Sequence, residues 1–297
     1  MGLMMVICDW LDVTYAPNAV PDAEVRLILM ANGFKVGYDQ GRKLTFYPPD
    51  GFRGAVVVTL SSRFAKVSFS GGACAYLRDV GAWDDILFEL STCPHTVTRL
   101  DAALDVPTDA AAVIAALSLR YPTGRVSLGR KALGVTKMLE TRSDGLDSGT
   151  YYVGHRTAAR ATARVYDKQL EQLKKGFLVE NPLTRYEVTA RKDYGATLRD
   201  AAEPDALFWH IASPALISCK PEGVPVWQPN NDLTGWQHTP RAYVPAEVLA
   251  NRVEYCAELE ALGLLSDELG AYGRTTLLNL IARKLGLPAV LQDDTAA

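Results

Sequence analysis

The chain has 297 residues, of which 48% are hydrophobic and 22% are charged, a composition typical of a folded globular protein with one large domain or two ordinary ones. Its net charge is −3, yet residues 120–199 hold sixteen Lys or Arg against eight Asp or Glu, a pattern typical of an anion-binding face or of a solvated basic surface. No apolar run approaches the roughly 20 residues that span a bilayer, so we expect no membrane contact. The five scattered cysteines form no C-x-x-C pair, so we expect reduced thiols in a cytoplasmic protein.

The first 200 residues predict an α+β fold with antiparallel sheet. Runs of β-branched and aromatic residues predict strands at 6–16, 55–61, 65–71, 96–106, 149–155, 162–168 and 184–191. Apolar periodicity predicts helices at 21–33, which Gly33 closes, and at 108–120, where Thr108 is the expected N-cap.

These elements follow a similar order twice. A strand with two acids, Asp9 and Asp12 or Asp101 and Asp105, leads into a helix and then into further strands. We therefore expect an internal duplication of a β-α-β-β unit, with halves at 1–95 and 96–205 in a catalytic region 1–205. The alternative is a chance likeness between two ordinary α+β segments.

The composition changes after this region. Residues 206–245 are rich in proline and predict a linker or a packed loop, and Trp227 and Trp236 favour packing. Residues 246–297 predict a helical tail, which is either a small DNA-binding or dimerisation module or a cap on the core.

Several common site types are absent from the sequence. The four histidines are isolated, so no H-x-H or H-E-x-x-H metal pair exists, and no phosphate-binding G-x-x-x-x-G-K-[ST] loop or G-x-S-x-G elbow is present. The sequence therefore argues against ATP use.

Acidic and basic residues remain, placed on strand faces. In 96–106 the alternation of a strand puts Arg99, Asp101 and Asp105 on one face, opposite Leu100, Ala102 and Leu104. Asp101 and Asp105 lie about 13 Å apart along a straight strand, so one metal binds both only if the strand bends.

The last two predicted strands have the same character. Residues 162–168 present Arg164, Tyr166 and Lys168 on one face, and residues 184–191 present Arg185, Glu187 and Arg191. If these strands are neighbours, their carboxylates suit Mg²⁺ or Mn²⁺ and their cations suit phosphate oxygens. A solvated outer face with cross-strand ion pairs is the alternative.

The succession RLDAALDV, GTYYVGHR, RVYDKQLE and RYEVTARKDY resembles the replication initiators of staphylococcal rolling-circle plasmids. It is also similar to the filamentous-phage replication proteins and to related conjugative-element relaxases. The early stretches CDWLDVTY and VSFSGGACAYL are similar to the opening segments of this group. The resemblance covers about residues 5–200.

The resemblance implies a replication initiation protein that nicks and rejoins one DNA strand. A tyrosine would attack the phosphodiester, leaving a 5′-phosphotyrosine and a free 3′-OH, with Mg²⁺ or Mn²⁺ as cofactor. It implies as partners a DNA origin in single-stranded or hairpin form, host helicase and polymerase, and a second copy in a homodimer. A relaxase with the same chemistry and a non-catalytic DNA-binding regulator are the alternatives.

The resemblance also implies site residues. The metal ligands are Asp101, Asp105 and Glu187, and the nucleophile is Tyr194, in KDYGATL. The plasmid initiators have more residues between strand and tyrosine, so Tyr151, Tyr152, Tyr166 and Tyr186 are rivals. Lys168 or Arg191 would stabilise the developing charge. Contacts with DNA are expected from Arg156, Arg164, Arg191 and Lys192.

Overall fold

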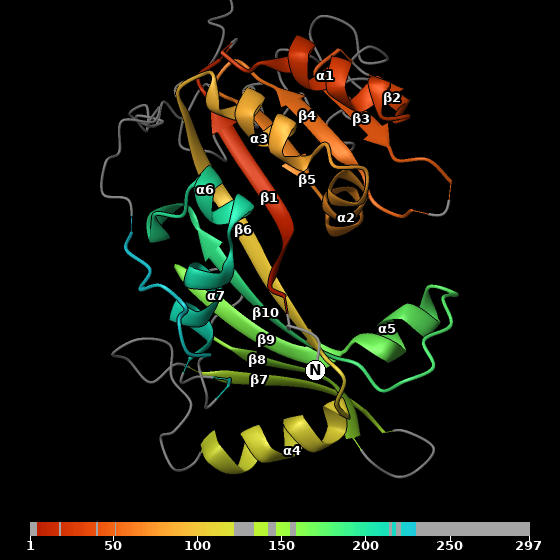
Figure 1. Cartoon of the computed structure of the whole chain (residues 1–297), viewed down its shortest axis with the longest axis vertical. Helices are drawn as coiled ribbons and strands as arrows, with labels where there is room; N and C mark the ends of the chain where they lie inside the picture. The colour runs from red at the N-terminus through yellow and green to blue at the C-terminus, as the bar shows by residue number, and fades with distance from the viewer. Residues whose placement is uncertain are drawn as a thin grey trace, which may run out of the picture. The chain divides into compact units, whose positions relative to one another are not determined.

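Ten strands in the described part of the chain form one antiparallel sheet in the order β2-β3-β4-β5-β1-β6-β10-β9-β8-β7 (Figure 1). The computed structural model describes residues 5–17, 19–39, 41–50, 52–121, 134–141, 147–154, 159–213, 216–217 and 221–229. All of them belong to a unit that spans residues 1–238. The predicted tail 246–297, together with Arg156 and Trp236, lies outside the described residues. No helix in the described ranges is long and apolar enough to cross a membrane.

The first half contains five strands and three helices. They follow one another as β1 (Ile7–Tyr15), α1 (Asp22–Ala31), β2 (Lys35–Asp39), β3 (Lys43–Tyr47), β4 (Val56–Leu60), β5 (Ala65–Phe69), α2 (Gly71–Asp79) and α3 (Trp83–Ser91). The strands predicted for β1, β4 and β5 are confirmed, as is the helix α1. Strands β2 and β3 and helices α2 and α3 are additional to the prediction.

The second half repeats this order. It comprises β6 (His95–Val106), α4 (Ala110–Arg120), β7 (Val135–Thr141), β8 (Asp147–Val153), β9 (Ala161–Asp167), α5 (Lys168–Lys174), β10 (Thr184–Arg191), the 3-10 turn η2 (Lys192–Tyr194), α6 (Leu198–Ala202) and α7 (Asp205–Ala212). Each half is a β-α-β-β-β-β unit followed by helices, so the repeating unit is longer than the predicted β-α-β-β. Helix α5 has no counterpart in the first half.

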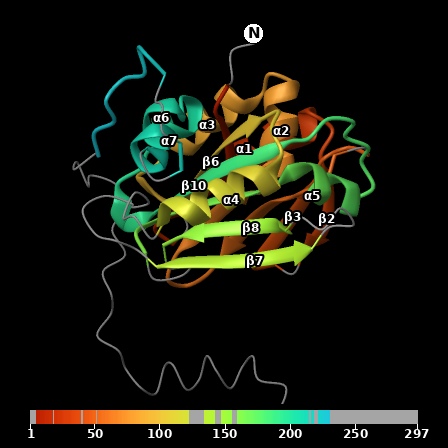
Figure 2. The same ribbon diagram turned by 90° about the horizontal axis from the view of Figure 1, so that it is seen from below.

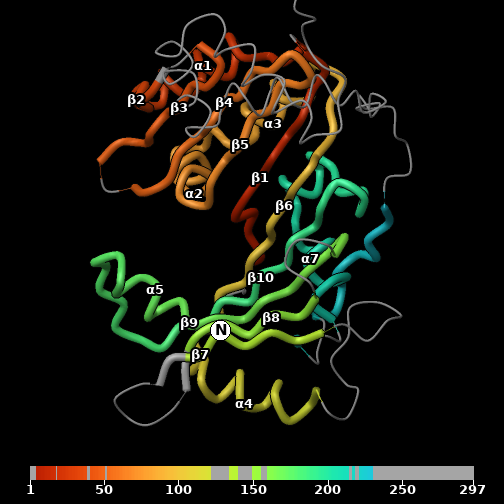
Figure 3. Tube along the Cα trace, turned by 180° about the vertical axis from the view of Figure 1, so that it is seen from behind, coloured from red at the N-terminus to blue at the C-terminus, as the bar shows by residue number. Residues whose placement is uncertain are grey.

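The two halves meet at their first strands. β1 and β6 pair antiparallel in the middle of the sheet, and Figure 3 shows them running side by side between the two halves. Strands β5 and β10, the last of each half, flank this central pair. The order of one half is therefore the mirror of the other across β1 and β6, which supports an internal duplication.

Two sequence-based boundaries need correction. The N-cap of α4 is Asp109, whose carboxylate accepts a hydrogen bond from the Ala111 N–H, instead of the predicted Thr108. The predicted start of the linker 206–245 is wrong, because residues 206–212 belong to helix α7. Trp227, in the same predicted linker, is buried as expected and donates a hydrogen bond to Asp200.

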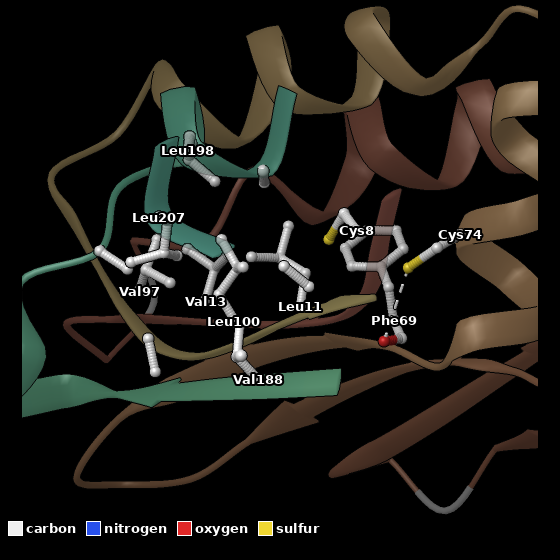
Figure 4. Packing of buried hydrophobic residues seen from close by; sticks show 14 of the residues in the cluster. Cys8, Leu11, Val13, Phe69, Cys74, Val97, Leu100, Val188, Leu198 and Leu207 are labelled. Carbon is white, nitrogen blue, oxygen red and sulfur yellow. Dashed lines mark hydrogen bonds between the residues drawn. The ribbon is translucent and has the colours of Figure 1, made fainter. Parts of the chain in front are cut away.

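One face of the sheet holds the hydrophobic core. Figure 4 shows apolar side chains of the central strands, such as Leu11 and Leu100, beneath Leu198 of α6 and Leu207 of α7. Tyr15, another residue of this core, donates a hydrogen bond to the Leu90 carbonyl of α3. Figure 2 shows α4 across the second half, where it contacts β8 and β9. The predicted apolar set of 96–106 faces this core, so its polar set lies on the opposite face.

Candidate DNA-cleavage site

The polar face of the second half is built by the register of β6, β10 and β9. Glu187 of β10 pairs with Ala103 on one side and with Arg164 of β9 on the other. Asp101 pairs with Thr189, two residues beyond Glu187. Asp101 and Glu187 are therefore diagonal neighbours on one face, at about the 7 Å separation that long side chains can bridge.

Both of these carboxylates are buried and each is bound by an arginine. Asp101 is 2% exposed and Glu187 is 1% exposed. Arg99 binds Asp101 with two hydrogen bonds of 3.0 and 2.5 Å, while Arg164 Nη2 lies 2.5 Å from Glu187 Oε1. Isolated buried carboxylates are strongly disfavoured, so these guanidinium groups allow the two acids to be held close together away from solvent.

The charge state of Glu187 reflects this crowding. Its pKa is raised to about 7 in total: burial is the largest cause, Arg164 acts in the opposite direction, and the nearby carboxylates of Asp101 and Asp9 add to the rise. A cation in addition to Arg99 and Arg164 would relieve the repulsion between the two carboxylates. The pair thus has an electrostatic environment that favours binding of a cation.

Asp105, the third predicted ligand, belongs to a different contact. Arg185 of β10 lies opposite Asp105 and binds it with two hydrogen bonds of 2.6 Å. The same guanidinium donates to Asp9 Oδ1 at 2.8 Å. Asp9 is the extra residue of a bulge in β1, and bulges change where a side chain points. Arg185 thereby ties the first strands of both halves together.

A divalent cation fits this face only as a two-carboxylate site. Within the described residues, no group of three or more His, Cys, Asp and Glu side chains is arranged to hold a metal ion. Mg²⁺ commonly keeps several waters and uses one or two protein carboxylates, which Asp101 and Glu187 can supply. Arg99 and Arg164 would then have to release the carboxylate oxygens that they now bind.

Tyr166 is the tyrosine in contact with this pair. Its hydroxyl donates to Glu187 Oε2 at 3.3 Å, and the charged groups of Arg164 and Lys168 lie 5.1 and 5.8 Å from the centre of its ring. It is 8% exposed, and burial raises its pKa well above the usual value, with the Glu187 charge acting in the same direction.

The other rivals predicted from the sequence lie elsewhere. Tyr151 and Tyr186 are buried residues of the core cluster, and Tyr151 donates to the Leu117 carbonyl of α4. Tyr152 is half-buried and pairs with Arg164, so it lies on the polar face.

Tyr194 lies in η2, beyond the end of β10. Arg191, which ends the strand, is about 13 Å from Glu187 along it. The half-buried ring of Tyr194 stacks on Trp227 with ring centroids 5.1 Å apart and also contacts His210 of α7. Burial raises its pKa to about 12, against the opposing effect of Arg160. The structure therefore brings Asp101, Glu187 and Tyr166 together and leaves Tyr194 on separate contacts.

The predicted cations fall in two places. Arg164 lies at the acid pair, and Lys168 begins α5, where its ammonium group is 2.5 Å from Glu171 Oε2. Arg191 ends β10 on the polar face, and Lys192 is exposed in η2.

Sequence reasoning missed Arg99 as a partner of Asp101, although the two-residue spacing on one strand could have indicated it. It also missed Trp10, over which Arg99 lies at 4.6 Å.

A pocket of about 500 Å³ opens beside the acid pair. Its walls come from the start of β1, the Phe52–Gly54 segment, the start of α2, helix α5, and strands β6, β9 and β10. Figures 1 and 3 show α2 and α5 on the same side of the molecule. Asp101, Arg164 and Tyr166 line this pocket, so it is continuous with the acid pair.

No family model matches this chain, and no curated protein matches it. Among solved structures, the rolling circle replication initiator protein from Geobacillus stearothermophilus is similar to it with a TM-score of 0.44 and 18% identity, over 70% of this chain and 79% of that one. The glycine cleavage system aminomethyltransferase T from Bartonella henselae is similar with a TM-score of 0.19 and 13% identity, over 69% of this chain and 45% of that one.

Proposed function

We propose that this chain is a replication initiation protein that nicks and rejoins one DNA strand at an origin. The observation that carries the proposal is the pair of buried carboxylates, Asp101 and Glu187, set among Arg99 and Arg164 on the polar face of the sheet. Carboxylates suit a divalent cation and guanidinium groups suit phosphate oxygens. The four sequence motifs that resemble rolling-circle initiators converge on these strands.

A divalent cation, Mg²⁺ or Mn²⁺, would be held by Asp101 and Glu187 and would neutralise charge on the scissile phosphate. Arg99 and Arg164, now bound to these acids, would then be available to the phosphate oxygens. Lys168 is 8% exposed at the start of α5 and would add positive charge on the pocket side. Asp105 stays with Arg185 and serves to hold the strands that carry the acids.

Strand cleavage needs no external energy in this scheme. The tyrosine oxygen forms a bond to phosphorus as the bond to the 3′ oxygen breaks, and the proton lost by the phenol balances the proton gained by the 3′-OH. The phosphotyrosine keeps the phosphodiester bond energy, so attack by a 3′-OH rejoins the strand. This agrees with the absence of a nucleotide-binding loop in the sequence.

We assign the attacking hydroxyl to Tyr194. Its ring is partly accessible, and Arg160, Arg191 and Lys192 lie near it in the structure or the sequence. Tyr166 is nearly buried and donates its hydroxyl hydrogen to Glu187, which suits a residue that positions this carboxylate. The assignment requires that Tyr194 leave its stack on Trp227 to meet a phosphate at the acid pair.

The test is a covalent adduct. Labelled single-stranded oligonucleotides that tile the DNA around the chain's own gene are incubated with the protein and Mn²⁺, and the protein–DNA adduct is mapped by mass spectrometry. We expect the adduct on Tyr194, lost in Tyr194→Phe and retained in Tyr166→Phe. An adduct on Tyr166 would reverse the assignment while leaving the nicking function intact.

A second candidate function is a non-catalytic DNA-binding regulator. It is favoured by the arginine partner that each of Asp101, Asp105 and Glu187 already has. Glu187→Gln separates the two functions, with the exposed Glu203→Gln as a matched control. A nicking enzyme loses cleavage in the first variant and keeps it in the second. DNA binding without any cleavage in the unaltered protein would favour the regulator. Neighbouring coat or transfer genes would separate an initiator from a relaxase.

A further inference from the structure

The lining of the pocket beside the acid pair contains more cationic than acidic side chains. Six cationic and three acidic side chains line it. Two of the cations, Lys168 and Arg185, are less than a tenth exposed. Arg164 and Arg185 also pair with Glu187 and Asp105, which are not part of the lining. Guanidinium and ammonium groups suit phosphate oxygens as well as carboxylates, so a phosphate fits this lining.

Aromatic rings share the same walls. Phe52 and Phe177 line the pocket and are 39% and 38% exposed, so part of each ring is open to a ligand. The guanidinium group of Arg53 lies 5.4 Å from the centre of the Phe177 ring, at the side of the pocket formed by both halves. Trp10 lines the pocket beside Arg99.

Rings interleaved with cations are the arrangement that binds unpaired nucleotides, because bases stack on the rings while the backbone meets the cations. The volume of about 500 Å³ is in the range of small-molecule sites. Phe52, Phe177 and Arg53 take no part in the contacts of the acid pair, and Phe52 packs on Tyr76 with ring centroids 4.7 Å apart.

We propose that this pocket holds one unpaired nucleotide of the DNA strand, next to the phosphate that is cut. The base stacks against Phe177 and Phe52, and its phosphate meets the cationic side chains shared with the acid pair. The inference rests on the proposed function, and it adds that the protein senses a base flanking the cleavage position. A duplex could not present such a base without unpairing it.

The first experiment measures nucleotide binding without cleavage. The full chain, in EDTA, is titrated with thymidine or deoxyadenosine 5′-monophosphate and with 2-deoxyribose 5-phosphate, and binding is followed by ligand-observed NMR. We expect at least one of the nucleotides to bind at least about fivefold more tightly than the sugar phosphate, because stacking adds to phosphate binding. Equal affinities would mean that the pocket recognises phosphate alone, and this would overturn the proposal.

Matched variants localise the effect. Phe177→Ala should remove the preference for the nucleotide, Phe177→Tyr should keep it, and the neighbouring Leu178→Ala, at a residue that is 82% exposed, should change nothing. Circular dichroism melts confirm that each variant is folded. A preference that survives in the folded Phe177→Ala and Phe52→Ala variants would refute the assignment to this pocket.

The second experiment places the nucleotide relative to the cut. Abasic sites are introduced one at a time around the cleavage position of an oligonucleotide, and we expect one flanking position to lower cleavage in the unaltered protein but not in Phe177→Ala. A flat profile would overturn the proposal even if nicking occurs. Nucleotide binding that depends on Phe177, in a protein that never cleaves DNA, would instead uphold the pocket and refute the nicking function.

Discussion

The raised pKa of Glu187 predicts that this residue destabilises the folded chain when no metal is bound. A rise from 4.5 to about 7 corresponds to a cost of about 3 kcal/mol for ionising the carboxyl group in the folded state. The side chain is 1% exposed, so solvent does not reduce this figure much. Glu187→Gln keeps the shape and removes the charge, and it leaves Arg164, which is 35% exposed, able to be hydrated.

The sign of the pH dependence follows from linkage. Because the pKa of Glu187 is higher in the folded than in the unfolded chain, its contribution to stability is fully present below about pH 4.5 and is lost as the pH rises through about 7. In EDTA, Glu187→Gln should therefore match the unaltered protein near pH 4.5 and exceed its stability above pH 7, by up to about 3 kcal/mol. Urea unfolding between pH 4.5 and 8.5 measures the difference.

Glu171 provides a control of opposite sign. Burial acts to raise its pKa, but hydrogen bonds from Lys168 and Lys175 lower it overall. Glu171→Gln should therefore lose stability at neutral pH, and the loss should fade as the pH falls below the ordinary value of a glutamate. If Glu187→Gln is instead less stable than the unaltered protein at pH 8, the ion pair with Arg164 outweighs burial, and the reasoning is wrong.

Three further predictions follow from the same contacts. Arg185→Met removes the partner of two acids and should lower the free energy of unfolding by roughly 3 kcal/mol, measured by urea denaturation. Arg199→Met, at a side chain that is 86% exposed, is the control, and equal losses in the two variants would refute the role of Arg185. Trp227→Ala uncovers Tyr194 and should bring the pKa of Tyr194 from about 12 toward 10. An ultraviolet titration measures this pKa, with Tyr194→Phe used to subtract the signal of the other tyrosines, and an unchanged pKa would mean that Trp227 does not bury the phenol. Binding of single-stranded DNA should weaken steeply with salt, because phosphate contacts release counterions; a flat response in fluorescence anisotropy would exclude a phosphate-binding face.

Strand faces are the part of the site that the sequence predicts well. Alternation alone separates Arg99 and Asp101 from Leu100, and it does the same for Glu187 and its neighbours, because a two-residue period is fixed by the backbone. The pairing of β6 with β10 joins residues that are far apart in the sequence, 80 positions for Arg185 and Asp105, and only the fold determines it. Hence Asp105 could be placed on the correct face while its partner, Arg185, could not be identified.

The missed elements have weak local signals for physical reasons. Helix α2 begins with Gly71 and Gly72, and glycine disfavours helix, but side chains there have no room: a Cβ at Gly72 would lie 1.3 Å from the Arg53 carbonyl oxygen. Helix α5 reads KQLEQLK and lacks an extended apolar period. The bulge that turns Asp9 toward Arg185 could not be predicted from the sequence, because neither Cys8 nor Trp10 is a residue type that indicates a bulge.

A comparison of the mirrored halves explains why the polar face of the second half carries the acid pair and the polar face of the first half does not. In the first half, the strands equivalent to β6 and β10 are β1 and β5, where Asp12 lies opposite Ser68. The charged side chain of β5 is Lys66, whose ammonium group is 3.4 Å from Asp12 Oδ2. Asp12 is thus a single carboxylate that is bound by Lys66 and Trp10. In the second half, two buried carboxylates, Asp101 and Glu187, are diagonal neighbours and each is bound by an arginine. Both halves therefore contribute walls to the pocket, but the pair of buried acids lies in the second half alone.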